Sequence, residues 1–136
     1  MTTPFFSQNW CASAAVEANN SAAMRKGFKN PAEFNHLMAL VVVDRDGLTT
    51  EVQFKDGRVA SWTPAKPRPD DMWAILAADA ATWRSAAEGA SNASKLLMAG
   101  QIKLRKGPIG AAIANAEALD EFVKSWGSVT TDWDAA

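Results

Sequence analysis

The run of residues from Asn92 to Trp126 constrains the fold of this chain more than any other segment. Its sequence, NASKLLMAGQIKLRKGPIGAAIANAEALDEFVKSW, predicts a short apolar helix, a strand over Ile102–Arg105 and a long helix that begins after Gly107-Pro108. Apolar residues recur along the long helix at every third or fourth position and so share one stripe: Ile109, Ile113, Ala116, Leu119, Val123 and Trp126. A helix with such a stripe covers an apolar sheet, and it either closes a solid core or roofs a cavity.

The first third of the chain predicts a helix. Ser7 is a suitable N-cap, and the alanine-rich segment 8–25 has high helix propensity. Gly27 is a good residue to end this helix. The polar sequence Asn19-Asn20-Ser21 interrupts the apolar stripe, so we expect the helix to break there.

Strands joined by tight turns are expected next. The segment 34–43 is apolar on both faces, which is typical of a central strand covered on both sides. The segment 48–55 alternates apolar and polar residues, which predicts one buried and one solvated face, and a third strand covers 58–63. The turn sequences Asp44-Arg45-Asp46-Gly47 and Lys55-Asp56-Gly57 join these strands into hairpins.

A proline-rich link, Pro64–Pro69, leads to the apolar run Met72–Ala77. Short apolar runs fit a strand or a helix, and we interpret this one as a fourth strand because the first three lack a partner. Two short helices follow, closed by Gly89 and Gly100, ahead of the strand and long helix described above.

The expected order is α-β-β-β-β-α-α-β-α. It predicts an α+β fold with a five-stranded, mostly antiparallel sheet covered by helices. Residues 1–136 fit a single domain, with an N-terminal helix over 1–33, a core over 34–126 and a tail over 127–136.

Charge and composition exclude several functions. Lys plus Arg is 14 against 15 for Asp plus Glu, so the net charge of -1 does not favour nucleic-acid binding. The single cysteine, Cys11, forms no internal disulfide, and the N-terminus lacks a signal-peptide pattern. The longest apolar run, Leu37–Val43, is far shorter than the roughly 20 residues of a membrane span. We therefore expect a soluble protein of the cytoplasm.

Residues for catalysis or metal binding are sparse. His36 is the only histidine, and no orienting partner for a Cys11–His36 pair is evident. We expect His36 to be a hydrogen-bonded strand-end residue and Cys11 a small apolar helix residue. The acidic pairs Asp70-Asp71 and Asp44/Asp46 lack the spacing of a calcium loop, so they are interpreted as solvated turn residues. We expect no metal, no cofactor and no enzyme activity.

The element order and several details resemble the sterol carrier protein 2 (SCP-2) family of lipid-transfer domains. The resemblance lies in the meander Met38–Trp62 with its Asp56-Gly57 turn, in MWAILAADAATWRSAAEG, and in KLLMAGQIKLRKG with the amphipathic helix after it. It implies a five-stranded sheet with an apolar tunnel between sheet and helices. Known members of the family bind fatty acids, fatty acyl-CoA, sterols or phospholipids. This chain departs from the pattern in its long proline-rich link and in lacking a peroxisomal Ser-Lys-Leu end.

Candidate ligand-binding residues are the large apolar side chains expected on the inner sheet face and on the helices: Leu40, Val42, Val52, Phe54, Trp62, Trp73, Trp83, Leu97, Met98, Ile113, Leu119, Phe122 and Trp126. Each of them also fits an ordinary core position. Free N–H groups at Gly107-Pro108-Ile109-Gly110, beside Lys103, Arg105 and Lys106, suggest a site for an anionic headgroup. The final helix and the tail with Trp133 would act as the lid.

These features predict non-catalytic binding and transfer of a hydrophobic ligand, with a membrane or an enzyme as transient partner. An alternative is an accessory or oligomerisation module of a lipid-related enzyme system, in which an apolar face packs on a partner. A second alternative is a small enzyme that acts on a bound hydrophobic substrate through His36.

Overall fold

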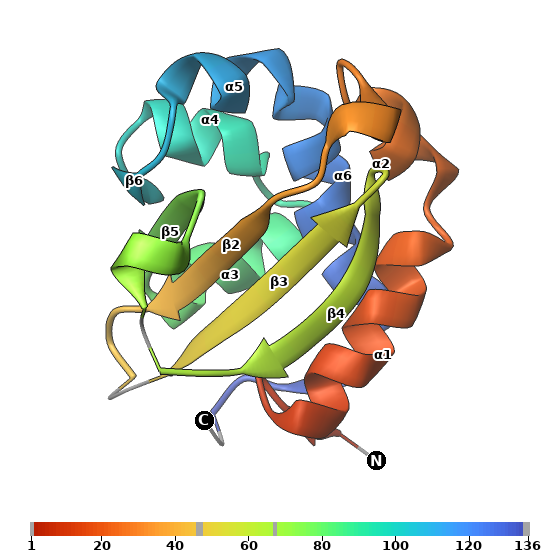
Figure 1. The fold of residues 1–136 in the computed structure, drawn as a ribbon. Helices are drawn as coiled ribbons and strands as arrows, with labels where there is room; N and C mark the ends of the chain where they lie inside the picture. The colour runs from red at the N-terminus through yellow and green to blue at the C-terminus, as the bar shows by residue number, and fades with distance from the viewer. Residues whose placement is uncertain (1, 46–47, 67, 135–136) are drawn as a thin grey trace.

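The computed structural model describes residues 2–45, 48–66 and 68–134. Its main sheet contains five strands, which are β2 (Leu37–Val42), β3 (Thr49–Lys55), β4 (Arg58–Pro64), β5 (Ala74–Ala78) and β6 (Lys103–Lys106). Their spatial order is β4-β3-β2-β5-β6 (Figure 1). The predicted α+β class and the five-stranded sheet are confirmed.

The sheet is mixed rather than purely antiparallel. β2 pairs in parallel with β5, whereas the other three neighbouring pairs are antiparallel. The reason is the link between Pro64 and Ala74, which leaves β4 at one edge of the sheet and returns the chain to the far side of β2. Part of that link forms a turn of 3-10 helix over Pro69–Asp71, and Pro67 lies outside the described residues. The prediction of a mostly antiparallel sheet is therefore confirmed, with one parallel pair.

Tight turns connect the first strands. Asp56 and Gly57 both have positive φ, at 54° and 73°, which is the conformation of a two-residue hairpin turn. The predicted turn at Asp56-Gly57 is confirmed. Asp46 and Gly47 of the other predicted turn lie outside the described residues.

Six helices lie in the described ranges: α1 (Gln8–Asn19), α2 (Ala22–Gly27), α3 (Ala80–Ala87), α4 (Ala93–Met98), α5 (Ile109–Ala114) and α6 (Ala116–Ser125). They gather on one side of the sheet (Figure 1). Single turns of 3-10 helix cover Pro31–Glu33 and Trp126–Ser128. None of the helices in the described part of the chain is long and apolar enough to cross a bilayer.

The main core lies between the sheet and the helices, and the opposite face of the sheet carries only a small apolar cluster around Ala39, Met72 and Ile75. The central position of β2 is confirmed. The expectation that it is covered on both sides holds only in part, because its second face meets only this small cluster, in which Ala39 is buried while Leu37 and Val41 are partly buried.

The break in the N-terminal helix is confirmed. Ser7 caps α1 by accepting a hydrogen bond from the Trp10 N–H, and Ser21 caps α2 in the same way. Asn19 at the end of α1 uses its amide to pair with both backbone groups of Val59, at 3.0 and 2.8 Å. This pairing fixes the end of α1 to the edge strand β4.

The long final helix predicted from the sequence is two helices. Asn115 separates α5 from α6 with φ −109° and ψ 24°. Its side-chain amide donates to the Ala111 carbonyl at 2.8 Å and accepts from the Lys29 N–H at 2.9 Å, and these bonds stabilise the break. The prediction of one continuous apolar stripe is wrong, because Ile109 and Ile113 are 51% and 56% exposed.

The segments near the two chain ends meet in a feature that the sequence did not indicate. β1 (Thr3–Pro4) and β7 (Thr131–Asp132) form a short parallel pair. Trp133 packs on Phe5 with 4.4 Å between ring centroids, and the Trp10 indole N–H donates to Thr131 Oγ1 at 2.8 Å. The C-terminal segment therefore closes the core beside the N-terminal segment.

Candidate functional site

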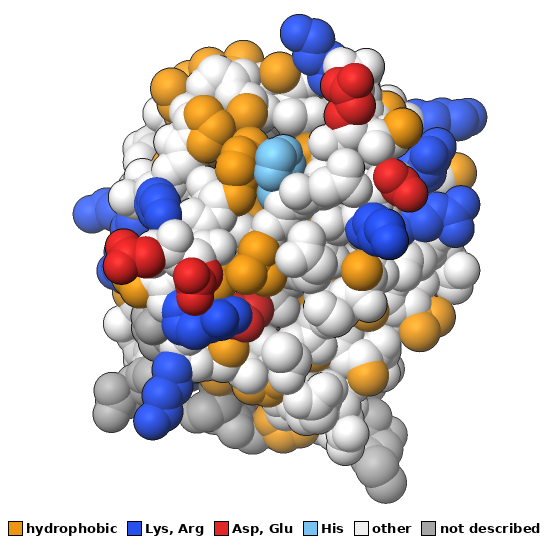
Figure 2. All heavy atoms as spheres, in the orientation of Figure 1, with side chains coloured by type: hydrophobic (Ala, Val, Ile, Leu, Met, Phe, Trp, Pro, Cys, Tyr) orange, Lys and Arg blue, Asp and Glu red, His pale blue; other side chains and the backbone are white. Residues whose placement is uncertain are grey.

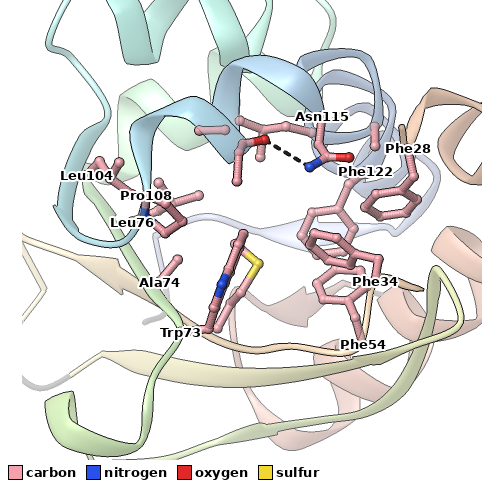
Figure 3. A pocket seen from close by; sticks show the side chains of 15 residues that line it. Phe28, Phe34, Phe54, Trp73, Ala74, Leu76, Leu104, Pro108, Asn115 and Phe122 are labelled. Carbon is pink, nitrogen blue, oxygen red and sulfur yellow. Dashed lines mark hydrogen bonds between the residues drawn. The ribbon is translucent and has the colours of Figure 1, made fainter. Parts of the chain in front are cut away.

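An apolar cavity lies between the sheet and the last two helices, with a volume of about 50 Å³. Figure 3 shows its walls, which consist of Phe28, Phe34, Met38, Phe54, Trp73, Ala74, Leu76, Leu104, Pro108, Ala111, Ala112, Asn115, Ala118, Leu119 and Phe122. Asn115 is the one polar side chain in this set. A concave, apolar site with few polar groups is typical of a pocket for a hydrophobic ligand.

One wall of the cavity is aromatic. The ring centroids of Phe28 and Phe34 are 4.4 Å apart, those of Phe34 and Phe54 are 5.3 Å apart, and those of Phe54 and Phe122 are also 5.3 Å apart. These rings come from four different segments and stand together on one side of the cavity (Figure 3). Each ring therefore packs against the next along this wall.

The opposite wall is made of small residues. Pro108, Ala111, Ala112 and Asn115 recur at helical spacing and turn one face of α5 toward the cavity. Gly107 precedes them with φ 127°, and a Cβ at this position would lie 2.9 Å from the Ala74 Cβ. Glycine is therefore required for the close approach of this segment to β5.

Trp73 stands at one side of the cavity with His36 against it. The two rings stack with centroids 4.0 Å apart and planes 10° apart. Burial beside the indole lowers the pKa of His36, because desolvation disfavours the charged imidazolium. Its backbone carbonyl accepts from the Phe54 N–H at 2.9 Å, whereas its imidazole packs against rings. The neutral form is thus favoured at this position.

The size of the cavity limits what it holds in this conformation. About 50 Å³ is comparable to the space of one or two water molecules, each of which takes about 30 Å³ of liquid volume. An acyl chain or a sterol therefore fits only if part of the wall moves outward. The lining contains no titratable side chain, so its chemistry is burial of apolar surface rather than proton transfer or nucleophilic attack.

The structure divides the sequence-predicted ligand residues into three groups. The first lines the cavity and contains Phe54, Trp73, Leu119 and Phe122. The second lies in the closed part of the core and contains Leu40, Val42, Val52, Trp62, Trp83 and Trp126. The third lines a groove on the outer surface between α4 and α5 and contains Leu97, Met98 and Ile113.

Most of the cavity lining was missed in the sequence. The missed residues are Phe28, Phe34, Met38, Ala74, Leu76, Leu104, Pro108, Ala111, Ala112, Asn115 and Ala118. A search for large apolar side chains cannot find alanines, although small residues are what leave the space. The useful signal was the sequence GPIGAAIAN, in which Pro108, Ala111 and Ala112 place small residues on the helix face that meets the cavity.

The predicted headgroup cations do not line the cavity. Lys103 and Arg105 are exposed and alternate along β6 with Leu104, which does line it. Lys106 donates to the backbone carbonyl of Pro69. A second, polar groove adjoins the cavity instead and shares Phe34, Ala111 and Asn115 with it. Its further lining residues are Lys29, Asn30, Glu33, His36, Gly110 and Ala114.

Cys11 is buried in the core, where its thiol approaches the Phe6 carbonyl with an S–O distance of 3.8 Å. Burial raises the pKa of this thiol to about 12, so it stays protonated and inert at neutral pH. Across the described ranges no three His, Cys, Asp or Glu side chains are grouped as metal ligands would be. Neither observation adds chemistry to the cavity.

No family model matches the chain, and no curated protein matches it either. Several solved structures, however, do match the chain. The crystal structure of a sterol carrier protein 2 has a TM-score of 0.80 and 25% identity, and the match covers 92% of this chain and 98% of that one. A conserved hypothetical protein of Thermus thermophilus, for which sterol carrier protein is named as a candidate identity, has a TM-score of 0.78, 24% identity and coverage of 97% and 94%. UbiJ-SCP2, described as a ubiquinone synthesis protein, has a TM-score of 0.56, 13% identity and coverage of 85% and 88%.

Proposed function

Because the chain has the fold of sterol carrier protein 2, we propose that it is a lipid-binding domain that carries its ligand in the cavity beneath α5. The observation that carries this proposal is the lining itself, in which Asn115 is the only polar side chain among 15 residues. A lipid tail is stabilised in such a site because its apolar surface is removed from water. The lining offers no group for catalysis, so the proposed activity is binding and transfer.

Apolar burial is sufficient for useful affinity. Each methylene removed from water contributes about 0.8 kcal/mol, so about ten methylenes reach the roughly 8 kcal/mol of micromolar binding before ordering costs. Fatty acids, fatty acyl-CoA and sterol-like molecules all offer this much apolar surface. The proposed ligand class is therefore a lipid with a long chain or fused rings.

The cavity must enlarge to accept such a ligand, and α5 is the element that we propose moves. None of its residues is buried, so displacing it exposes little apolar surface. Its C-terminal end is tied to Lys29 through Asn115, whereas each ring of the aromatic wall opposite packs against another ring. The cavity would thus open by displacement of α5 away from the sheet and the aromatic wall.

An anionic headgroup is proposed to lie in the polar groove beside the cavity. This groove shares wall residues with the cavity and is lined by Lys29, whose ammonium group would pair with the anion, by the neutral imidazole of His36 and by one carboxylate, that of Glu33. The cations predicted from the sequence, Lys103, Arg105 and Lys106, lie on β6 away from the cavity lining and fit this role less well.

The experiment that tests the proposal is native mass spectrometry of the purified protein followed by denaturing extraction of any released lipid. A bound lipid mass, or saturable uptake of a fluorescent fatty acid, is the expected result. Ala111→Trp should abolish uptake because its indole fills the cavity. Ile113→Trp is the matched control, since Ile113 is 56% exposed on the same helix and lines neither the cavity nor the polar groove. Uptake that is equal in both variants would contradict the proposal.

An accessory role in a protein assembly is the second candidate, and it is favoured by the likeness in fold to UbiJ-SCP2. A lipid carrier should release bound lipid on extraction, whereas an accessory module should bind a partner without lipid. Light scattering on the purified protein, with lipid extraction of each species, separates these functions. Deleting the C-terminal residues is not a clean test, because Thr131 pairs with Thr3 and stabilises the core.

A further inference from the structure

The outer face of α5 is apolar and has no partner in the described structure. Ile109 and Ile113 lie four positions apart on one side of the helix, and neither lines the cavity, whereas Ala112 lines both the cavity and the outer groove. Met98 at the end of α4 is 66% exposed, and a groove between these helices joins it to Ile113. A helix that is apolar on all sides is normally covered by something.

The chain around this face has an unusual charge. From Gly89 to Ala116 it contains no Asp or Glu, yet it contains four cations, Lys95, Lys103, Arg105 and Lys106. The whole protein has a net charge of -1, so the excess of acid lies elsewhere. The segment that carries the apolar face is therefore locally basic.

The apolar and basic groups lie together on one part of the surface. In Figure 2 hydrophobic side chains gather over α5 at the upper left, and Lys and Arg side chains project at the left edge, where β6 lies in Figure 1. Acidic side chains also lie beside these cations in Figure 2, and Asp70 and Glu117, which adjoin the segment, form no ion pair within the described residues. Two further carboxylates are engaged. Asp120 of α6 accepts from Ser94 at the start of α4, at 2.7 and 2.9 Å, and Asp71 pairs with Arg68 at 3.1 Å.

We propose that α4, β6 and α5 form a docking surface for an anionic phospholipid membrane. Ile109, Ile113 and Met98 would enter the bilayer interface, and the lysines and arginine would pair with anionic headgroups. This inference rests on the proposed lipid-binding function and deepens it, because docking would bring α5, the movable wall of the cavity, into contact with the source of the ligand. Charge complementarity selects a membrane over a neutral protein partner.

The test is co-flotation of the full chain with vesicles of phosphatidylcholine containing roughly 30 mol% phosphatidylserine, compared with pure phosphatidylcholine. The wild type should bind the anionic vesicles, and raising NaCl from about 0.05 to about 0.5 M should release it. Replacing one cation, as in Arg105→Gln, should weaken binding about five-fold.

Ile109→Ser with Ile113→Ser should weaken vesicle binding by about ten-fold or more, because both side chains lose their apolar burial. Val16→Ser is the matched control, since Val16 is 58% exposed on α1, which is remote from the segment 89–116 in sequence and does not line the cavity. Circular dichroism melting should show that all variants fold.

Fatty-acid uptake from detergent-free solution separates this inference from the proposed function. The double serine variant should keep uptake, because neither isoleucine lines the cavity. Equal binding to neutral and anionic vesicles, or full binding by the double variant, would overturn the docking surface. A dimer that the double variant dissolves, without vesicle binding, would overturn it in favour of self-association. Failure of the wild type to take up any fatty acid would instead overturn the lipid-binding function.

Discussion

Two apolar regions lie between the same sheet and the same layer of helices, and they are packed differently. Near the chain ends, large rings meet large rings: Trp10 contacts Phe5, Trp62 and Trp126 edge-to-face, with centroids 5.0, 5.3 and 5.5 Å apart. Beneath α5, a wall of phenylalanines faces alanines and a proline. The first region is closed, and the second contains the cavity.

The difference between the two regions shows that apolar content alone does not decide whether a core is solid. Interlocking rings fill space because each edge enters the gap left by its neighbour. Alanine on one side of an interface leaves room that a ring on the other side cannot fill. The function proposed for this protein depends on that contrast, and substitutions in each region test it.

The largest effect is expected in the closed region. Trp126→Ala removes a fully buried ring that contacts Trp10, Trp62, Trp83 and Phe122, and should lower the free energy of unfolding by about 3–5 kcal/mol. Urea denaturation measures this change. Trp126→Phe is the control, because the Trp126 indole N–H is buried without a hydrogen-bond partner, so its loss offsets part of the lost packing. Equal losses for both variants would show that ring packing does not stabilise this region.

The same replacement of alanine by tryptophan should lower stability more in the closed region than beneath α5. Ala14→Trp introduces an indole beside fully buried residues of α1 and should cost about 1–3 kcal/mol or more through overpacking. Ala111→Trp puts an indole into a cavity of about 50 Å³, which accepts it only if α5 moves outward; because no residue of α5 is buried, its loss of unfolding free energy should be smaller than that of Ala14→Trp. Thermal melts of the two variants give the comparison. If Ala111→Trp were as destabilising as Ala14→Trp, the space beneath α5 would not accept added volume.

Asn115 should control the movement of α5 with a moderate effect on stability. Asn115→Ala removes the bonds to Ala111 and Lys29 and should cost about 1 kcal/mol. Amide hydrogen exchange should accelerate in α5 and stay unchanged in α1, since α5 would lose its tie to Lys29. Asn19→Ala is a matched control, because its amide also makes two backbone bonds but at the edge of β4. Unchanged exchange in α5 would contradict a tethered, movable wall.

The smallest effect is a pH dependence that arises from His36. Burial holds the pKa of this imidazole below its ordinary value of 6.5, so the folded state binds the proton less readily than the unfolded state. The resulting stability is present above that ordinary pKa and is lost as pH falls through the lower folded pKa. His36→Gln should therefore flatten the pH dependence of stability between about pH 7 and pH 5. Denaturation midpoints over this range measure the difference, and an unchanged slope would assign the dependence to other groups.

Much of the fold was predictable because its signals are local. Ser7 and Ser21 act as caps, Asp56-Gly57 forms its turn, and the alternation along β3 places Val52 and Phe54 inside. The helix break at Asn115 was not predicted, because it depends on a side-chain bond to Lys29 that is remote in sequence. The pairing of Thr3 with Thr131 was missed because a strand of two residues has no periodicity.

The candidate site was harder to predict than the fold. Large apolar residues such as Leu40, Val52 and Trp62 have the same sequence signature as Phe54 and Phe122, yet only the last two line the cavity. The distinction depends on what each side chain faces across the core. It is therefore a property of tertiary packing, which a hydrophobic pattern does not record.

The most direct test of a lipid site beneath α5 is an NMR titration of the indole N–H signals with a saturated fatty acid. The chain contains six tryptophans, of which Trp73 lines the cavity while Trp10 and Trp62 lie in the closed region. The Trp73 signal, assigned by Trp73→Phe, should shift saturably, and the signals of Trp10 and Trp62 should stay in place. A saturable shift of Trp10 and Trp62 with Trp73 unchanged, or no saturable shift at all, would contradict a lipid site in this cavity.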